Sequence, residues 1–257
     1  FLPIGPYCQG ATPTSLPANS TNGIAGTWNP PTISTATPGS ATYTFTPTSI
    51  DPNTCAVATN LSIVTTTLPT ATIAGTTTVC QNAGQPNITF TGANSVAPYT
   101  FTYNINGGSD VLISSPTGAN SITLAVPTST PGTYTYNLTN VAVGSCANPV
   151  TAQSAVITVS SNTTPTFAQV GPYCNGASIP ALPTNSINNI AGTWAPAINN
   201  VATSTAVTTN YTFTPTAGPG VCATQANMAI VVHPNTTPTF LPIGPYCQGA
   251  TPTSLPA

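Results

Sequence analysis

Hydrophobic and polar residues alternate over several short stretches of this chain. Every second residue from Cys55 to Ile63 falls on one face of an extended segment, and the same holds from Cys222 to Val232. An alternation with a period of two predicts β-strands with one buried face. Because each cysteine shares its face with apolar residues, we expect a disulfide in the core on that face.

Aromatic residues indicate further strands. Thr residues alternate with aromatic residues over 42–46 and again over 211–214. The same two regions each hold one tryptophan, within the sequence Gly-Thr-Trp. We expect these side chains in the core, with each tryptophan packed on a disulfide as in immunoglobulin domains. The expected core residues are Trp28, Tyr43, Phe45, Trp194, Tyr211 and Phe213.

The middle of the chain has the same kind of pattern. Apolar residues alternate over 99–105, 122–126, 134–138 and 155–159, and Asn106-Gly107-Gly108 forms a turn signal. Regular short strands separated by turn signals are typical of β-sandwiches. The chain as a whole therefore predicts an all-β fold of tandem, immunoglobulin-like β-sandwich domains.

The sequence also repeats itself at two scales. Residues 1–18 recur without change at 240–257, an offset of 239 residues (240 − 1). The motifs GPYC-x-GA, IAGTW and YTFTPT each occur once in 1–66 and once in 162–234. Self-similarity of this kind predicts an array of modules. We expect the chain to be one period of a longer array.

These repeats divide the chain into four segments. They are a short module at 1–66, a longer module at 67–161, a second short module at 162–234 and the start of another short module at 235–257. The linker NTTPTF begins the second and third short modules, at 162–167 and 235–240. We therefore expect the first module to lack its initial residues and the last one to continue past residue 257.

The seven cysteines predict one disulfide per module. The pairs expected are Cys8–Cys55, Cys80–Cys146 and Cys174–Cys222, and Cys247 should find its partner beyond residue 257. Zinc sites need closely spaced cysteine pairs and reactive thiols need a nearby base, so both are disfavoured. Closing a loop of roughly 48 residues stabilises a module by about 4 kcal/mol in the chain-entropy model. Disulfides also indicate an oxidising, extracellular compartment.

Charge is nearly absent, with no Lys or Arg, two acidic residues and one His. Nucleic-acid binding needs cationic side chains, so it is not expected. Catalysis draws mostly on titratable or nucleophilic groups, so we predict no enzyme, no cofactor and no metal. Asp51 and Asp110 lie in different modules, which disfavours calcium. The sequence Asp51-Pro52-Asn53 predicts a turn. We expect His233 to be a solvated residue in a linker. No apolar run is long enough for a membrane helix.

The motifs carry a resemblance to a known family. GPYC-x-GA, IAGTW and YTFTPT resemble the immunoglobulin-like repeats of large Bacteroidota surface proteins, including gliding-motility adhesins of the SprB type. The segments PYTFTYNINGG and GTYTYNLTNV of the middle module resemble the PKD-like domains of the same proteins. The resemblance implies type IX secretion, attachment to the cell surface and an adhesive or filamentous role.

The function expected from these observations is structural. Modules joined by short Thr-Pro linkers form an extracellular filament or adhesin stalk, because proline stiffens the junctions. A net charge near zero favours association of the chain with itself. An alternative is an array of carbohydrate-binding modules that bind surface glycans through exposed aromatic residues. A third possibility is assembly of short subunits by strand exchange, with the recurring 18 residues as the donated strand.

Overall fold

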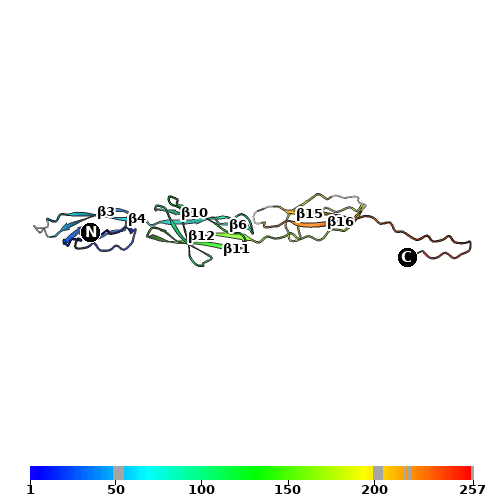
Figure 1. Cartoon of the computed structure of the whole chain (residues 1–257), viewed down its shortest axis with the longest axis horizontal. Coiled ribbons are helices and arrows are strands. Elements are labelled where there is room, and N and C mark those ends of the chain that lie inside the picture. The colour runs from blue at the N-terminus through cyan, green and yellow to red at the C-terminus, as the bar shows by residue number, and fades with distance from the viewer. Residues whose placement is uncertain (49–54, 199–204, 217, 219–220, 256–257) are drawn as a thin grey trace. The chain divides into compact units, whose positions relative to one another are not determined.

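The computed structural model describes residues 1–48, 55–198, 205–216, 218 and 221–255, and this part of the chain is all-β (Figure 1). It contains strands and turns and no helix, and so no helix that could span a membrane. The chain divides into two compact units, residues 1–161 and 162–257. The first unit holds the first short module and the middle module.

The first short module contains one four-stranded sheet with the order β1-β4-β3-β2. The pairs β2/β3 and β3/β4 are antiparallel, whereas β1 lies parallel to β4. The parallel pair places the first strand of the module beside the end of its last strand. The strands are β1 (Tyr7–Cys8), β2 (Gly26–Asn29), β3 (Gly39–Pro47) and β4 (Thr59–Thr66).

The core of this module lies on one face of the sheet. Tyr43 and Ile63 are buried there with Ile33 from a loop. In the described part of this module, irregular segments with several prolines stand in place of the second sheet that the sandwich prediction requires. Proline has no N–H to offer to a sheet, and these segments are tied down by isolated hydrogen bonds, such as Thr35 Oγ1 to the Ala11 carbonyl at 2.6 Å.

The middle module has two sheets, with the orders β10-β7-β5 and β6-β12-β11-β8-β9. As in the short module, the early strand β6 runs parallel to the last strand, β12, while the other pairs are antiparallel. The strands are β5 (Thr70–Ala74), β6 (Thr77–Cys80), β7 (Asn87–Ala93), β8 (Thr100–Ile105), β9 (Val111–Ser114), β10 (Ser121–Ala125), β11 (Gly132–Val143) and β12 (Cys146–Ser160).

Side chains from both sheets of the middle module form one core. Phe90 of the smaller sheet and Phe101 of the larger one are stacked, with ring centroids 5.7 Å apart. Tyr99 fills the space beside Gly92, where an added Cβ would lie 2.3 Å from the Tyr99 ring. The alternation over 99–105 corresponds to burial of Tyr99, Phe101 and Tyr103, while Ile105 at the strand end is 36% exposed.

The second unit repeats the topology of the first short module. Its sheet has the order β13-β16-β15-β14, and β13 again lies parallel to the last strand. Met228, Ile230 and Val232 of β16 are buried with Tyr211 of β15, as their alternation predicts. The strands are β13 (Tyr173–Cys174), β14 (Gly192–Ala195), β15 (Val207–Pro215) and β16 (Ala226–His233).

The segment before β4 differs from the prediction. We expected Cys55 and Val57 on the core face of the last strand, but β4 begins only at Thr59. Val57 is 80% exposed, and Cys55 is exposed with a φ of 44°. This backbone interrupts the alternation, so the cysteine lies outside the core. The turn predicted at Asp51-Pro52-Asn53 lies outside the described residues.

Candidate functional site at the module junction

A disulfide joins two different modules. Cys8 of the first short module is bonded to Cys146 of the middle module, with their Cα atoms 5.5 Å apart and a sequence separation of 138. The predicted pairs Cys8–Cys55 and Cys80–Cys146 are therefore wrong. The bond connects the first strand of one module to the last strand of the next.

The parallel strand pair explains why the bond leaves its own module. Cys8 lies opposite Thr66, the last residue of β4, whereas Cys55 precedes Thr59, the first residue. The 8 residues of β4 separate these ends by about 23 Å at roughly 3.3 Å per residue. A disulfide needs Cα atoms within about 7 Å, so Cys8 and Cys55 cannot bond in this fold.

The remaining cysteines follow the same geometry. Cys174 lies opposite His233 at the end of β16, far from Cys222 before its start, and Cys174 has an exposed free thiol. The predicted Cys174–Cys222 bond is therefore wrong, and so is the rule of one disulfide within each module. Cys80 and Cys222 are each disulfide-bonded. Cys247 has an exposed free thiol, and its predicted partner beyond residue 257 stays a prediction.

Polar contacts surround the Cys8–Cys146 bond. Thr66 Oγ1 lies 3.0 Å from Cys146 Sγ, within hydrogen-bond distance. Asn148 Nδ2 donates to the Pro69 carbonyl at 2.9 Å, and Thr67 Oγ1 donates to the Asn94 carbonyl. The segment that links the two modules thus has polar contacts with Asn94, Cys146 and Asn148 of the middle module, in addition to the covalent bond at this junction.

We expected Trp28 to pack on a disulfide, but it packs on two phenylalanines instead. Its ring centroid lies 5.2 Å from that of Phe45 and 4.7 Å from that of Phe1. Its Nε1 donates to the Pro17 carbonyl at 2.8 Å. Gly26 in the IAGTW motif makes room for this cluster, because an added Cβ would lie 2.2 Å from Phe45 Cζ. The tryptophan is half-buried.

The second short module repeats this arrangement. Trp194 lies 4.7 Å from Phe167 and 5.2 Å from Phe213, and its Nε1 donates to the Pro183 carbonyl at 2.9 Å. This tryptophan is half-buried as well. The four other residues predicted for the core are all buried, namely Tyr43, Phe45, Tyr211 and Phe213.

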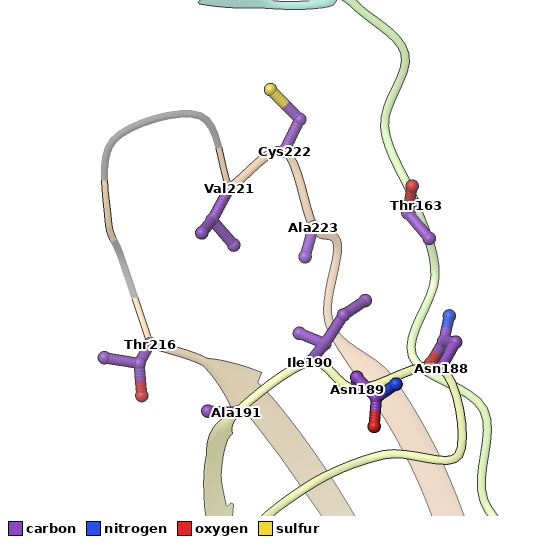
Figure 2. A pocket seen from close by; sticks show the side chains of 9 residues that line it. All are labelled: Thr163, Asn188, Asn189, Ile190, Ala191, Thr216, Val221, Cys222 and Ala223. Carbon is purple, nitrogen blue, oxygen red and sulfur yellow. The ribbon is translucent and has the colours of Figure 1, made fainter.

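A hollow of about 430 Å³ opens in the second unit beside Cys222 (Figure 2). Residues 188–191 and 221–223 line it together with Thr163 and Thr216. Apart from Cys222, these side chains are amides, hydroxyls and aliphatic groups. Figure 2 shows the sulfur of Cys222 pointing away from the other labelled side chains. The lining offers no acid, base or cation for catalysis.

The few ionisable groups are scattered. Asp110 accepts a long contact of 3.4 Å from Asn104, and exposed His233 ends β16 opposite Cys174 rather than lying in a linker as predicted. Burial raises the pKa of both Tyr103 and Tyr136. Unfavourable interactions with Tyr103 and Tyr134 raise the pKa of Tyr136 further. Among the described residues, no group of three or more His, Cys, Asp and Glu could hold a metal ion.

No protein-family model matches this chain, and no curated protein matches it. Cysteines recur at the ends of the modules, and the Cys8–Cys146 bond is a cross-link between neighbouring modules.

Proposed function

We propose that this chain is a tension-carrying segment of an extracellular filament or adhesin stalk. The observation that carries the proposal is the Cys8–Cys146 bond, which joins one module to the next. The modules are otherwise connected by a short peptide segment between Thr66 and Thr70. Two covalent connections hold this junction, where a string of independent domains has only one.

The bond creates a short covalent path through the first unit. A pull on Phe1 passes along residues 1–8, across the sulfurs to Cys146, and along β12 to Ser160. Residues 9–145 lie in a closed loop outside this path. Tension therefore cannot draw them out, even when the modules unfold, unless the disulfide is broken. This property suits a fibre that is stretched.

The cross-link also restricts the unfolded chain. With a sequence separation of 138, the chain-entropy model gives a stabilisation of about 5 kcal/mol. Small modules benefit from such bonds, since a domain near 70 residues buries a limited core. Disulfides persist in oxidising compartments, which supports our proposal that the chain acts outside the cell.

The finer fold assignment belongs to the same proposal. We assign the middle module to the immunoglobulin-like or PKD-like β-sandwiches, supported by its two sheets around one core. The short modules are then reduced relatives in which irregular segments replace one sheet. The motif resemblance to gliding-motility adhesins supports cell-surface attachment and type IX secretion, with other copies of the chain as partners.

The carbohydrate-binding alternative receives no support from the aromatic residues. Stacking on a sugar needs an open aromatic face, and both tryptophans pack against two phenylalanines. Their N–H groups already donate to the carbonyls of Pro17 and Pro183. We therefore propose a structural role without catalysis.

The proposed function is tested on the source cells. Antibodies raised against the purified chain should label filaments on the outer surface of intact cells in electron micrographs. Cells in which the gene is deleted provide the control and should lose both the label and the filaments. Labelling confined to the cell interior would contradict the proposal.

A further inference from the structure

Three cysteines occupy one position in the three modules. Cys8 lies opposite Thr66, Cys80 opposite Ser160 and Cys174 opposite His233, each in a strand parallel to the end of the last strand. We call these the first-strand cysteines. Each therefore lies at the end of its module from which the chain leaves.

Three other cysteines lie at the opposite end. Cys146 is the first residue of β12, and Cys55 and Cys222 each come four residues before the last strand of a short module, at Thr59 and Ala226. We call these the last-strand cysteines. Cys8–Cys146 connects a first-strand cysteine with the last-strand cysteine of the following module. Cys80 and Cys222, one of each kind, are disulfide-bonded too.

We propose that the free thiol of Cys174 forms a disulfide with Cys55 of a following module of the 1–66 type. The inference rests on the proposed function, because it requires that such a module follows. Residues 240–257 repeat 1–18 and so match the beginning of such a module. The bond would extend the cross-link seen at Cys8 to the junction between two short modules.

The linker supplies the geometry for this bond. Asn162–Phe167 and Asn235–Phe240 are identical, and each begins two residues after the strand-end residues Ser160 and His233. Thr163 of the first linker accepts from the Thr224 N–H at 3.0 Å and donates to the Cys222 carbonyl at 2.7 Å. The linker residue Thr163 is thus hydrogen-bonded to Cys222, the last-strand cysteine of the same module.

The second linker should hold Cys55 in the same way. Thr236 corresponds to Thr163, and Cys55-Ala56 corresponds to Cys222-Ala223. Thr236 is three residues from His233, a span of at most about 11 Å in an extended chain. Since His233 lies opposite Cys174, a cysteine paired with Thr236 lies one short span of chain from Cys174. The proposed bond requires this span to be shorter than its extended length, because a disulfide needs Cα atoms within about 7 Å.

The chemistry is a thiol–disulfide exchange with a disulfide oxidant, either a small molecule or an oxidoreductase. The Cys174 thiolate attacks the oxidant and releases one of its sulfurs as a thiol, which gives a mixed disulfide. The Cys55 thiolate then attacks the Cys174 sulfur and releases the second thiol. Two protein thiols lose two protons and two electrons, and one oxidant disulfide is reduced.

The test lengthens the full chain after Ala257 with a second copy of residues 19–66, which completes the module begun at residue 240. Cys55 of the original copy is replaced by serine, so that only the added copy carries this thiol. The protein is refolded with oxidised and reduced glutathione, alkylated, and digested with chymotrypsin without reduction. Mass spectrometry should find Cys174 linked to the added Cys55 and protected from alkylation.

A Cys174→Ser variant is the matched control. It should leave the added Cys55 open to alkylation and retain the Cys8–Cys146 peptide. An alkylated Cys174 in the parent protein would overturn the inference, whether or not Cys8–Cys146 has formed. If Cys174 is alkylated but antibodies label filaments on the cell surface, the proposed function is still supported and only this inference fails. If Cys174 is linked but no label is found outside the cell, only the proposed function is contradicted.

Discussion

Residues 1–18 and 240–257 have the same sequence and different surroundings. In the first copy, Phe1 packs on Trp28, Ile4, Tyr7 and Leu16 lie against the core, and Cys8 is cross-linked. In the second copy, the described residues are exposed, with Phe240 at 74% and Leu241 at 87%. The identical segment forms a strand only where β4 lies beside it.

A turn within the segment forms in both copies. The Tyr7 hydroxyl accepts from the Thr14 N–H at 3.1 Å, and Tyr246 accepts from Thr253 at 3.0 Å. The N–H groups of Ala11 and Ala250 each donate to a cysteine carbonyl three residues earlier at 3.0 Å. The local sequence therefore specifies the turn, whereas the strand and the disulfide depend on the rest of the module.

The largest difference between the two copies should come from their cysteines. Cys8→Ser removes a cross-link worth about 5 kcal/mol in the chain-entropy model, so we expect the first unit to melt roughly 10 °C lower or more. Cys247→Ser should change stability by less than about 0.5 kcal/mol. Calorimetry without reductant measures both. A Cys8→Ser/Cys146→Ser double variant excludes effects of the thiol left behind, and equal melting of all variants would refute the comparison.

An intermediate difference is expected for the phenylalanines. Phe1→Ala removes a half-buried ring from Trp28 and Phe45, and should cost about 2 kcal/mol, less than a fully buried ring. Phe240→Ala removes an exposed ring and should be neutral. Urea unfolding followed by tryptophan fluorescence gives the two values, and a loss of stability in Phe240→Ala would show that the second copy is packed.

The smallest difference concerns the shared turn. Tyr7→Phe should destabilise the first module by about 1 kcal/mol through the lost hydrogen bond, while Tyr246→Phe should leave global stability unchanged. Amide hydrogen exchange sharpens the point, since Thr14 and Thr253 should each lose protection in the corresponding variant. An amide of Thr253 that exchanges freely in the unaltered chain would show that the turn is not local.

The sequence predicted the strands because their information is local. Thr42–Thr46 and Met228–Val232 alternate with a period of two, and Tyr43, Phe45, Met228, Ile230 and Val232 are buried accordingly. It did not predict the disulfides, because they depend on which strands pair and in which direction. The parallel pairing of Cys8 with Thr66 leaves no local trace, and it moves the cysteine to the far end of the module from Cys55.

The sequence also did not predict that the described residues of each short module form a single sheet. The sandwich prediction rested on the regular spacing of strand-like segments and on one Trp per module. Between β1 and β2, however, Pro13 and Pro17 occupy a stretch that is held by single hydrogen bonds such as Trp28 Nε1 to the Pro17 carbonyl. Trp28 packs against Phe1 and Phe45. A tryptophan in this motif therefore does not imply a neighbouring disulfide.

Stretching a single molecule tests the central claim most directly, namely that the Cys8–Cys146 bond carries tension across the module junction. The chain is held at Phe1 and Ser161 in optical tweezers and pulled with and without the bond. With the bond intact, residues 9–145 should stay outside the extended length at every force below the one that breaks the disulfide. In the Cys8→Ser/Cys146→Ser variant, with Cys80 also replaced by serine in both proteins because it is disulfide-bonded, they should add about 480 Å at roughly 3.5 Å per residue. An equal extension of the two proteins would contradict the account.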